Sequence, residues 1–386
     1  MAQGMLAALR SLDPHVLTEV VRRDQQEPDL EVTDWTVRPL SNKGLINPDG
    51  LFLFSGEARA GEATRPWSVV LKRLTKPERE HQPHEMLYWK REVSAAQSGL
   101  LDELPGPVVA PRCYGTREFE DSAWLWMEHI HDARGGAWTL DDFAYAAKQL
   151  GRFNGAYLTG TRLPSESWFC HRLARQWVEW WRTNQADWEN PYLSRYVSSD
   201  LREQVAQLWA ERDRFYRALD RLPQVFSHFD YQRRNLFIRQ EAAGHAGHEE
   251  VVATDWAWCG TGPVGGDLYA LVGSSCAVFE WDSARMRELE EGVSESYVAG
   301  LRDAGWDGDP DLVRLGYTAW IALHFGAVGL SWIGMWCIEE KEEVVATSFK
   351  RSLDEAASGW ATMCAFALSR AEEARELMAK LQPEHR

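Results

Sequence analysis

Short β-rich runs near the N-terminus are the first pattern along the chain. Residues 35–42, 51–58 and 67–74 are rich in β-branched, aromatic and aliphatic residues and are separated by Gly, Asn, Pro and Asp, which is typical of an antiparallel meander. Residues 85–101 carry apolar side chains at helical spacing and predict a helix. The run 123–127 predicts a further strand. Together these elements predict a small β-rich lobe.

Helical spacing dominates the rest of the chain. The long helical stretches cover 140–160, 172–184, 200–220, 283–304 and 345–380. One β-rich segment, 225–255, interrupts them. The pattern predicts an α+β fold with two lobes, a small antiparallel β-rich N-lobe over 1–130 and a larger, mostly helical C-lobe over 131–386.

The charge balance narrows the range of partners. The 386 residues include 42 Lys and Arg against 58 Asp and Glu, a formal net charge of -16. This balance argues against a nucleic-acid partner, which requires basic surfaces, and against an anionic membrane surface. It favours the attraction of a cationic small molecule, although a charge that only maintains solubility accounts for the same number.

Cysteines and apolar stretches bear on the compartment. The six cysteines are scattered without zinc-site or disulfide spacing, and no signal-peptide pattern begins the sequence, so we expect reduced thiols and a cytoplasmic location. Residues 319–338 are apolar for long enough to span a bilayer. Because this stretch contains His324 and several glycines and is followed by the acidic run 339–343, we predict a buried helix or helix pair. An integral membrane protein is the weaker alternative.

Three oxygen-bearing side chains gather around the β-rich segment 225–255. Asn235 and Asp255 are equidistant from His245, at the centre of a predicted turn, so an antiparallel hairpin would bring them together at its open end. Asp230 lies five residues before Asn235, on the segment that enters the same end. A cluster of carboxylate and amide oxygens without His or Cys is suited to Mg²⁺.

The order of several motifs resembles a known family. His228-x-Asp230-x4-Asn235 followed by Asp255 resembles the catalytic loop and metal-binding Asp of the aminoglycoside phosphotransferase and choline-kinase-like family, a small-molecule branch of the protein-kinase fold. The segments 68–72 (SVVLK), 88–92 (YWKRE) and 262–268 (GPVGGDL) resemble three further family motifs, in the family's order. The match extends over roughly residues 35–330 and implies a two-lobed protein-kinase-like fold with a nucleotide-binding N-lobe.

The resemblance implies roles for the residues of the C-lobe motifs. Asp230 would orient the acceptor hydroxyl and take its proton. Asn235 and Asp255 would hold Mg²⁺ across the phosphates of ATP. His228 and Asp267 would support the catalytic loop from behind. The alternative is that the Asp and Asn residues only form turns and that Asp267 only caps a helix.

Roles for N-lobe residues follow from the same resemblance. Lys72 would contact the α- and β-phosphates of ATP, and Glu92 would hold Lys72 in place. The backbone of the connection between the lobes would meet the adenine edge at Glu128, His129 and Ile130. Taken alone, Lys72 could be an ordinary edge-strand lysine, and Glu80 and Glu85 are rivals of Glu92.

The chain also departs from the family pattern. Phe229 stands where the family often has Gly, and Asp255 is followed by Trp-Ala instead of Phe-Gly. No G-x-G-x-x-G occurs, so the candidate phosphate loop is 41–50, where backbone N–H groups could bind phosphate. Only 12 positions separate Asp255 from Asp267, too few for a peptide-docking activation segment, and the expected acceptor is therefore small.

Tryptophan is unusually frequent, at 20 residues, and 13 of them lie between Trp168 and Trp336 in the predicted C-lobe. Trp177, Trp180 and Trp181 share one helical face. They could be core residues between helices, or a few could line an acceptor pocket, where aromatic faces bind sugars and cations.

The predicted function is therefore an ATP- and Mg²⁺-dependent phosphotransferase acting on a hydroxyl of a small molecule, with an amino sugar or aminoglycoside as the first candidate acceptor. The alternatives are a kinase of another small alcohol, such as a neutral sugar, a choline-like alcohol or another antibiotic, and a non-catalytic nucleotide-binding pseudokinase. Neither the oligomeric state nor the choice between ATP and GTP follows from the sequence.

Overall fold

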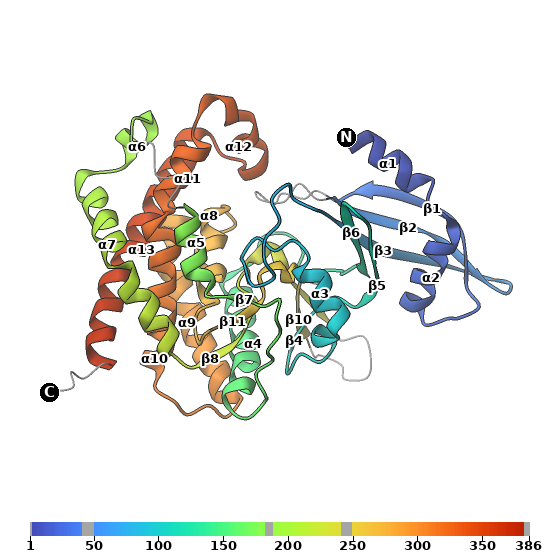
Figure 1. The fold of residues 1–386 in the computed structure, drawn as a ribbon, viewed down its shortest axis with the longest axis horizontal. Coiled ribbons are helices and arrows are strands. Elements are labelled where there is room, and N and C mark those ends of the chain that lie inside the picture. The colour runs from blue at the N-terminus through green and yellow to red at the C-terminus, as the bar shows by residue number, and fades with distance from the viewer. Residues whose placement is uncertain (1, 41–49, 182–187, 241–248, 382–386) are drawn as a thin grey trace. The chain divides into compact units, whose positions relative to one another are not determined.

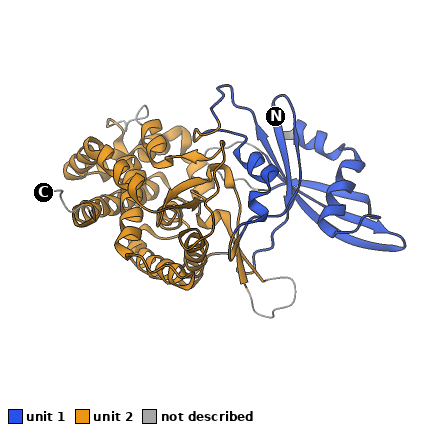
Figure 2. Ribbon diagram, turned by 60° about the horizontal axis from the view of Figure 1, so that its bottom comes forward, with its two compact units in different colours: residues 1–82, 87–104, 109–132 blue, residues 83–86, 105–108, 133–386 orange. Residues whose placement is uncertain are grey.

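The protein chain forms two compact units in a computed structural model that describes residues 2–40, 50–181, 188–240 and 249–381. Unit 1 comprises residues 1–82, 87–104 and 109–132, and unit 2 comprises residues 83–86, 105–108 and 133–386 (Figure 2). The predicted antiparallel sheet is in the N-terminal part and the predicted helices are in the C-terminal part, so the α+β prediction is confirmed.

Unit 1 is built on a five-stranded antiparallel sheet with the strand order β1-β2-β3-β6-β5. Its strands are β1 (Glu31–Pro39), β2 (Leu51–Ala60), β3 (Ala63–Thr75), β5 (Cys113–Glu118) and β6 (Ser122–Glu128). The strands predicted over 51–58, 67–74 and 123–127 are all present, and the first predicted run begins earlier than expected, at Glu31.

Helices α1 (Ala2–Arg10), α2 (Pro14–Gln25) and α3 (Arg91–Ser98), with the 3₁₀ turn η1 (Leu100–Asp102), complete unit 1. Asp13 caps α2 by accepting a hydrogen bond from the backbone N–H of His15, and Pro14 occupies the first helical position, where its missing N–H costs nothing. The buried face of α2 packs with Phe54 of β2 and Leu71 of β3 in one apolar cluster.

The helix predicted over 85–101 is wrong at residues 85–90, because α3 begins only at Arg91, and α3 ends at Ser98. The backbone groups of His84 and Met86 instead form hydrogen bonds with other residues of unit 2. His84 accepts hydrogen bonds from the His171 N–H and from the Gln176 side-chain amide, and the Met86 N–H donates to Gln176 Oε1 at 2.7 Å. These backbone groups therefore do not take part in a helical ladder.

Unit 2 is mainly helical (Figure 1). Its α-helices are α4 (Leu140–Leu158), α5 (Leu173–Trp181), α6 (Pro191–Tyr196), α7 (Ser199–Arg221), α8 (Ser275–Ala277), α9 (Met286–Asp303), α10 (Pro310–Ile321), α11 (Gly329–Trp336), α12 (Glu342–Phe349) and α13 (Leu353–Leu381). Its 3₁₀ turns are η2 (Arg233–Asn235), η3 (Trp256–Trp258), η5 (Ser283–Arg285) and η7 (Glu339–Lys341), and its π-helical turns are η4 (Ala270–Ser274) and η6 (Ala322–Ala327). The helix predicted over 345–380 is interrupted at Lys350, which has a left-handed φ of 55°.

Unit 2 also contains short strands, which flank several of its loops. They are β7 (Cys170–His171), β8 (Gln224–Ser227), β9 (Leu236–Gln240), β10 (Glu249–Ala253) and β11 (Gly260–Pro263), and β4 (Val108–Val109) crosses the boundary between the two units along the chain. β9 and β10 form the predicted antiparallel hairpin, and β11 lies between β7 and β8.

Helices α4 and α9 touch backbone to backbone. A Cβ at Gly151 of α4 would lie 2.1 Å from the Tyr297 carbonyl oxygen, and one at Gly300 of α9 would lie 2.0 Å from the Lys148 carbonyl oxygen, so only glycine fits at either position. Beside this contact Asn154 donates to the Phe226 carbonyl at 3.1 Å and accepts from the Tyr297 hydroxyl at 2.8 Å. The helix pair thus fixes β8.

The apolar stretch predicted as a buried helix or helix pair runs through α10, η6 and α11. Among the described residues, the helical stretch Pro310–Trp336 is long and apolar enough to cross a membrane, but 83% of its most apolar window is buried inside the protein. Helices α10 and α11 both pack against α13 (Figure 1). This burial agrees with the prediction of a core helix pair.

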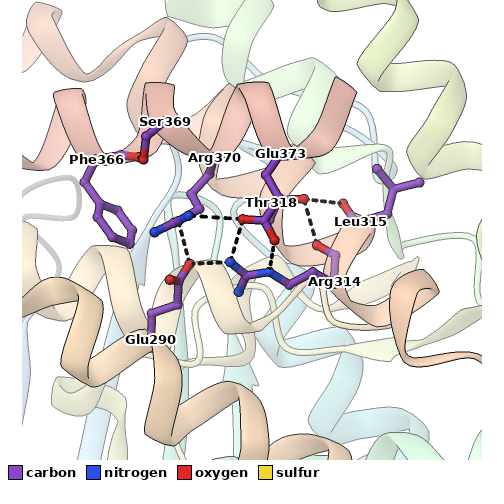
Figure 3. Close-up of polar contacts among 8 residues, drawn as sticks. All are labelled: Glu290, Arg314, Leu315, Thr318, Phe366, Ser369, Arg370 and Glu373. Atoms are coloured by element: carbon purple, nitrogen blue, oxygen red, sulfur yellow. Dashed lines mark hydrogen bonds and ion pairs between the residues drawn. The ribbon is translucent and has the colours of Figure 1, made fainter. Parts of the chain in front are cut away.

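A charged cluster ties α9, α10 and α13 together (Figure 3). Buried Glu290 of α9 lies 3.2 Å from Arg314 Nη2 and 2.8 Å from Arg370 Nε. Glu373 accepts from Arg314 Nη2 at 2.7 Å and from Arg370 Nη1 at 3.1 Å. Two carboxylates thus face two guanidinium groups. The pKa of Glu290 is raised, chiefly by burial, whereas the pKa of Glu373 is lowered, because its arginine partners outweigh its burial.

A Glu290→Leu variant tests this cluster. We expect the free energy of unfolding to fall by about 3–5 kcal/mol, because buried Arg370 loses its nearest carboxylate. The control is Glu288→Leu on the same helix, where an exposed pair with Arg285 is removed and the loss should stay below about 1 kcal/mol. Urea unfolding of both variants measures the difference, and losses of equal size would show that the buried cluster has no special weight.

Candidate active site

The predicted catalytic loop lies between β8 and η2 in unit 2. β8 pairs with β11, placing Ser227 opposite Gly260, where a Cβ would lie 2.2 Å from the Cys170 carbonyl oxygen. β8 and β7 therefore both approach the β11 backbone closely. β8 ends at Ser227, so His228 and Asp230 directly follow a strand that is paired with β11.

Asp230 is held by two side-chain amides. Its Oδ1 accepts from Gln232 Nε2 at 2.7 Å, and its Oδ2 accepts from Asn235 Nδ2 at 2.7 Å. The Gln232 N–H also donates to the Asp230 carbonyl at 2.8 Å, forming a tight turn. These two hydrogen bonds fix the direction of the carboxylate. The arrangement presents a half-buried carboxylate able to accept a proton.

His228 supports this loop through both ring nitrogens. Its Nδ1 accepts from the Asp230 N–H at 3.2 Å, so the proton of the neutral ring is on Nε2, which donates to the Thr254 carbonyl at 3.0 Å. The ring is buried beside Trp256, with centroids 4.5 Å apart. His228 therefore links the predicted catalytic loop to the end of the β9–β10 hairpin.

Asp267 binds the same loop from the opposite side. Its carboxylate accepts from the His228 N–H at 3.1 Å and from the Phe229 N–H at 2.7 Å. Burial raises the pKa of Asp267 to about 7, and the two backbone donors oppose that rise. These two hydrogen bonds make Asp267 a support of the loop, across sequence separations of 39 and 38 residues.

Asn235 and Asp255 both lie at the open end of the β9–β10 hairpin, and the strand register differs by one residue from the predicted alignment. The strands pair Leu236 with Ala253, so Asn235 stands opposite Thr254, whose N–H donates to the Asn235 carbonyl at 2.8 Å. The predicted turn around His245 lies outside the described residues. Asp255 follows with a left-handed φ of 64°, at the start of η3.

The donor set at this end fits Mg²⁺. Because Asn235 Nδ2 donates to Asp230, the Asn235 Oδ1 is the atom that would face a cation, and Asp255 would add a carboxylate. Over the residues that the structure describes, no group of three or more His, Cys, Asp and Glu side chains is arranged to hold a metal ion. Two protein oxygens suit Mg²⁺, which retains waters and shares its shell with phosphates.

Lys72 and Glu92 form a buried ion pair in unit 1. Lys72 Nζ lies 2.5 Å from Glu92 Oε2, and the two side chains are 7% and 5% exposed. Lys72 belongs to β3, between Leu51 of β2 and Leu125 of β6, and Glu92 lies in the first turn of α3. Of the two rivals of Glu92, Glu80 pairs with Lys76 instead.

The predicted adenine-contact segment ends β6. The Glu128 N–H donates to the Arg112 carbonyl at 3.0 Å, and the Glu128 side chain pairs with the Arg112 guanidinium at 3.2 Å. His129 Nδ1 lies 2.9 Å from Ser68 Oγ, and burial is the main cause that lowers the pKa of this histidine. His129 and Ile130 are both half-buried.

Part of the predicted phosphate loop lies outside the described residues, and the sequence analysis missed three residues that contact the loop of Asp230. Residues 41–49 of the candidate phosphate loop lie outside the described residues. Sequence reasoning missed Gln232, Tyr269 and Trp320, which contact Asp230 or its neighbour Phe229. Only Gln232 left a signal, since it stands two residues after Asp230, where a polar side chain can bond back within a turn.

The tryptophans divide by burial. Of the predicted helical trio, Trp177 and Trp181 are buried, as core residues would be, and Trp180 is half-buried. Trp177 also lies 5.7 Å from half-buried Trp258, ring centroid to ring centroid. Two partly accessible rings therefore rest on a buried one, which is the kind of surface that could receive an acceptor.

Comparison with known proteins adds structural likeness alone. No family model matches the sequence, and no curated protein sequence matches it. A choline kinase from Cryptosporidium parvum Iowa II is similar in structure at a TM-score of 0.51 and 13% identity, over 94% of this chain and 97% of that one. The chain has the protein-kinase-like fold.

Two further solved structures show weaker likeness. A Plasmodium vivax ethanolamine kinase has a TM-score of 0.48 and 11% identity, over 92% of this chain and 88% of that one. A spectinomycin phosphotransferase in complex with ADP and spectinomycin has a TM-score of 0.47 and 11% identity, over 93% and 99%. The predicted resemblance is confirmed at the level of the fold by the likeness to the choline kinase.

Proposed function

We propose that this chain is an ATP- and Mg²⁺-dependent phosphotransferase that phosphorylates a hydroxyl of a small cationic molecule. The observation that carries the proposal is Asp230, whose two carboxylate oxygens are held by Gln232 and Asn235 on a loop fixed by His228 and Asp267. A carboxylate oriented in this way can accept the proton of a hydroxyl as it attacks a phosphoryl group.

The remaining roles follow from the chemistry of each group. Asn235 and Asp255 would hold Mg²⁺, which when bound would offset the negative charge of the phosphates. In unit 1, Lys72 would bind the α- and β-phosphates and Glu92 would fix its ammonium group. Backbone groups of Glu128 to Ile130 would contact the adenine edge.

A cationic acceptor is favoured by charge and by aromatic surface. The chain carries a net charge of -16, which attracts cations and repels the anionic nucleotide. Trp180 and Trp258 present partly accessible rings supported by buried Trp177. Amino sugars and aminoglycosides combine positive charge with hydroxyls, and the solved structures with the same fold include a choline kinase, whose acceptor by name is also cationic.

The deciding assay is transfer of labelled phosphate from ATP to a panel of aminoglycosides, amino sugars, neutral sugars and choline, with and without Mg²⁺. We expect Mg²⁺-dependent labelling of at least one cationic acceptor. Labelling of neutral sugars alone would support phosphotransferase activity but contradict the proposal that the acceptor is cationic. No transfer to any acceptor, together with no thermal shift on adding Mg²⁺ and ATP, would favour a non-catalytic protein.

A further inference from the structure

Phe229 adopts an unusual backbone conformation for its residue type. It lies between His228 and Asp230 and has a φ of 64°, in the left-handed region that glycine occupies without strain and that a residue with a Cβ rarely adopts. Strained conformations of this kind persist only where the surroundings hold them. Because Phe229 directly precedes Asp230, the residues that hold Phe229 also influence the direction of the Asp230 side chain.

Three groups hold the backbone and ring of Phe229. Its N–H donates to Asp267, and its carbonyl accepts from the Tyr269 hydroxyl. Its ring is 0% exposed and stacks on Trp320 of α10, with centroids 5.2 Å apart and planes at 20°. A Cβ at Gly262 would lie 2.5 Å from the ring, so glycine at that position leaves the space that the ring fills.

Trp320 contacts both parts of this arrangement. Its indole, 2% exposed, stacks on the Phe229 ring and also on the Tyr269 ring, at 5.3 Å and 27°. It therefore packs against the strained residue and against the residue that bonds to its carbonyl oxygen.

We propose that Trp320 and Tyr269 are positioning residues that aim Asp230 by holding Phe229 in its left-handed conformation. The inference rests on the proposed phosphotransferase function. Packing of the aromatic ring stabilises the left-handed backbone conformation, which glycine at the same position would adopt without such support. The competing explanation is that the three aromatic residues only fill the core of unit 2.

Two substitutions at Phe229 separate these explanations. Phe229→Ala removes the ring but keeps a Cβ on a left-handed backbone, whereas Phe229→Gly removes the ring and relieves the strain. We expect kcat to fall by about tenfold or more in Phe229→Ala, because small misplacements of a catalytic group are costly. We expect Phe229→Gly to retain clearly more activity, with the KM for ATP within about twofold of wild type in both. A glycine variant as poor as the alanine variant, or poorer, would support simple core filling.

A double-mutant cycle tests whether Trp320 acts through Phe229. Trp320→Leu should lower kcat by about tenfold in the wild-type background but by less than about twofold when Phe229 is already Gly. Trp320→Phe, which keeps an aromatic ring, should rescue part of the loss. Equal effects in both backgrounds would overturn the proposal. The control is Trp306→Leu, which removes a buried indole beside Gly308 and should not reproduce the pattern.

Hydrogen exchange gives a readout that does not require activity. The Asp230 N–H is bonded to His228 Nδ1, so a loop that loses its direction should exchange faster in the peptide covering 226–232. We expect faster exchange there in Trp320→Leu and in Tyr269→Phe, which removes only one hydroxyl, and unchanged exchange in Trp306→Leu. Unchanged exchange in both test variants would overturn the positioning role. If the wild-type chain transferred phosphate to no acceptor, the proposed function would fail while this measurement still decided the positioning role.

Discussion

An Asp230→Asn variant should transfer phosphate about 10²–10⁴-fold more slowly than the wild type, because the amide cannot take the proton of the acceptor hydroxyl. Affinity for Mg²⁺ and ATP should stay within about tenfold, since Asp230 is proposed to act on the acceptor. Steady-state kinetics with the best acceptor of the panel and nucleotide titration by calorimetry measure the two quantities separately.

The matched control is Asp282→Asn in the same unit. Asp282 accepts a hydrogen bond from the Ala284 N–H at 2.9 Å and caps η5, a role that asparagine fills equally well. This variant should keep wild-type kinetics. If Asp230→Asn transferred phosphate at the wild-type rate, Asp230 would not be the base that takes the hydroxyl proton. A large loss in both variants would point to a general effect of lost negative charge.

The second large effect concerns the buried pair of Lys72 and Glu92. Removing one member of a buried ion pair costs about 3–5 kcal/mol of folding stability, whereas an apolar replacement of both members is often neutral. We therefore expect Glu92→Leu to be strongly destabilised and the double variant Lys72→Met/Glu92→Leu to regain most of that stability. Activity should be lost in both, because neither holds a lysine ready for phosphate. Thermal unfolding and the transfer assay measure the two outcomes.

This pair of measurements separates structure from chemistry. If the double variant regained both stability and activity, Lys72 and Glu92 would be a structural pair and their proposed role at the nucleotide would be wrong. Lys90→Met provides the control in the same unit, because it removes the half-exposed partner of Glu118. It should cost less than about 1 kcal/mol and leave transfer unchanged.

Local patterns predicted the elements that place the candidate site. The runs over 51–58, 67–74 and 123–127 form strands because alternating β-branched and aromatic residues between turn formers favour a meander. The hairpin after Asn235 forms as expected, and its register differs by one residue from the alignment centred on His245. Turn type sets such a register, and hydrophobic pattern alone leaves a one-residue ambiguity.

Long-range contacts were beyond the sequence pattern. The segment 85–90 has helical spacing, yet Met86 within it and His84 just before it bond to Gln176, some 90 residues away. Trp320 reads as a core residue in an apolar run, and nothing in its spacing indicates that it stacks on Phe229. Phe229 itself was visible as a departure from the glycine of the family that the motifs resemble, and the structure shows Phe229 in a left-handed conformation, which glycine adopts without strain.

The glycine contact between α4 and α9 has a consequence for how the site unfolds. Asp230, Asn235, Asp255 and Asp267 all lie in the sequence between these two helices, so the contact of Gly151 with Gly300 closes one long loop around them. Closing such a loop costs entropy that grows only slowly with its length, and that cost is incurred once for everything inside it. We therefore expect the four side chains to open together, with a free energy that depends on the contact between the two helices.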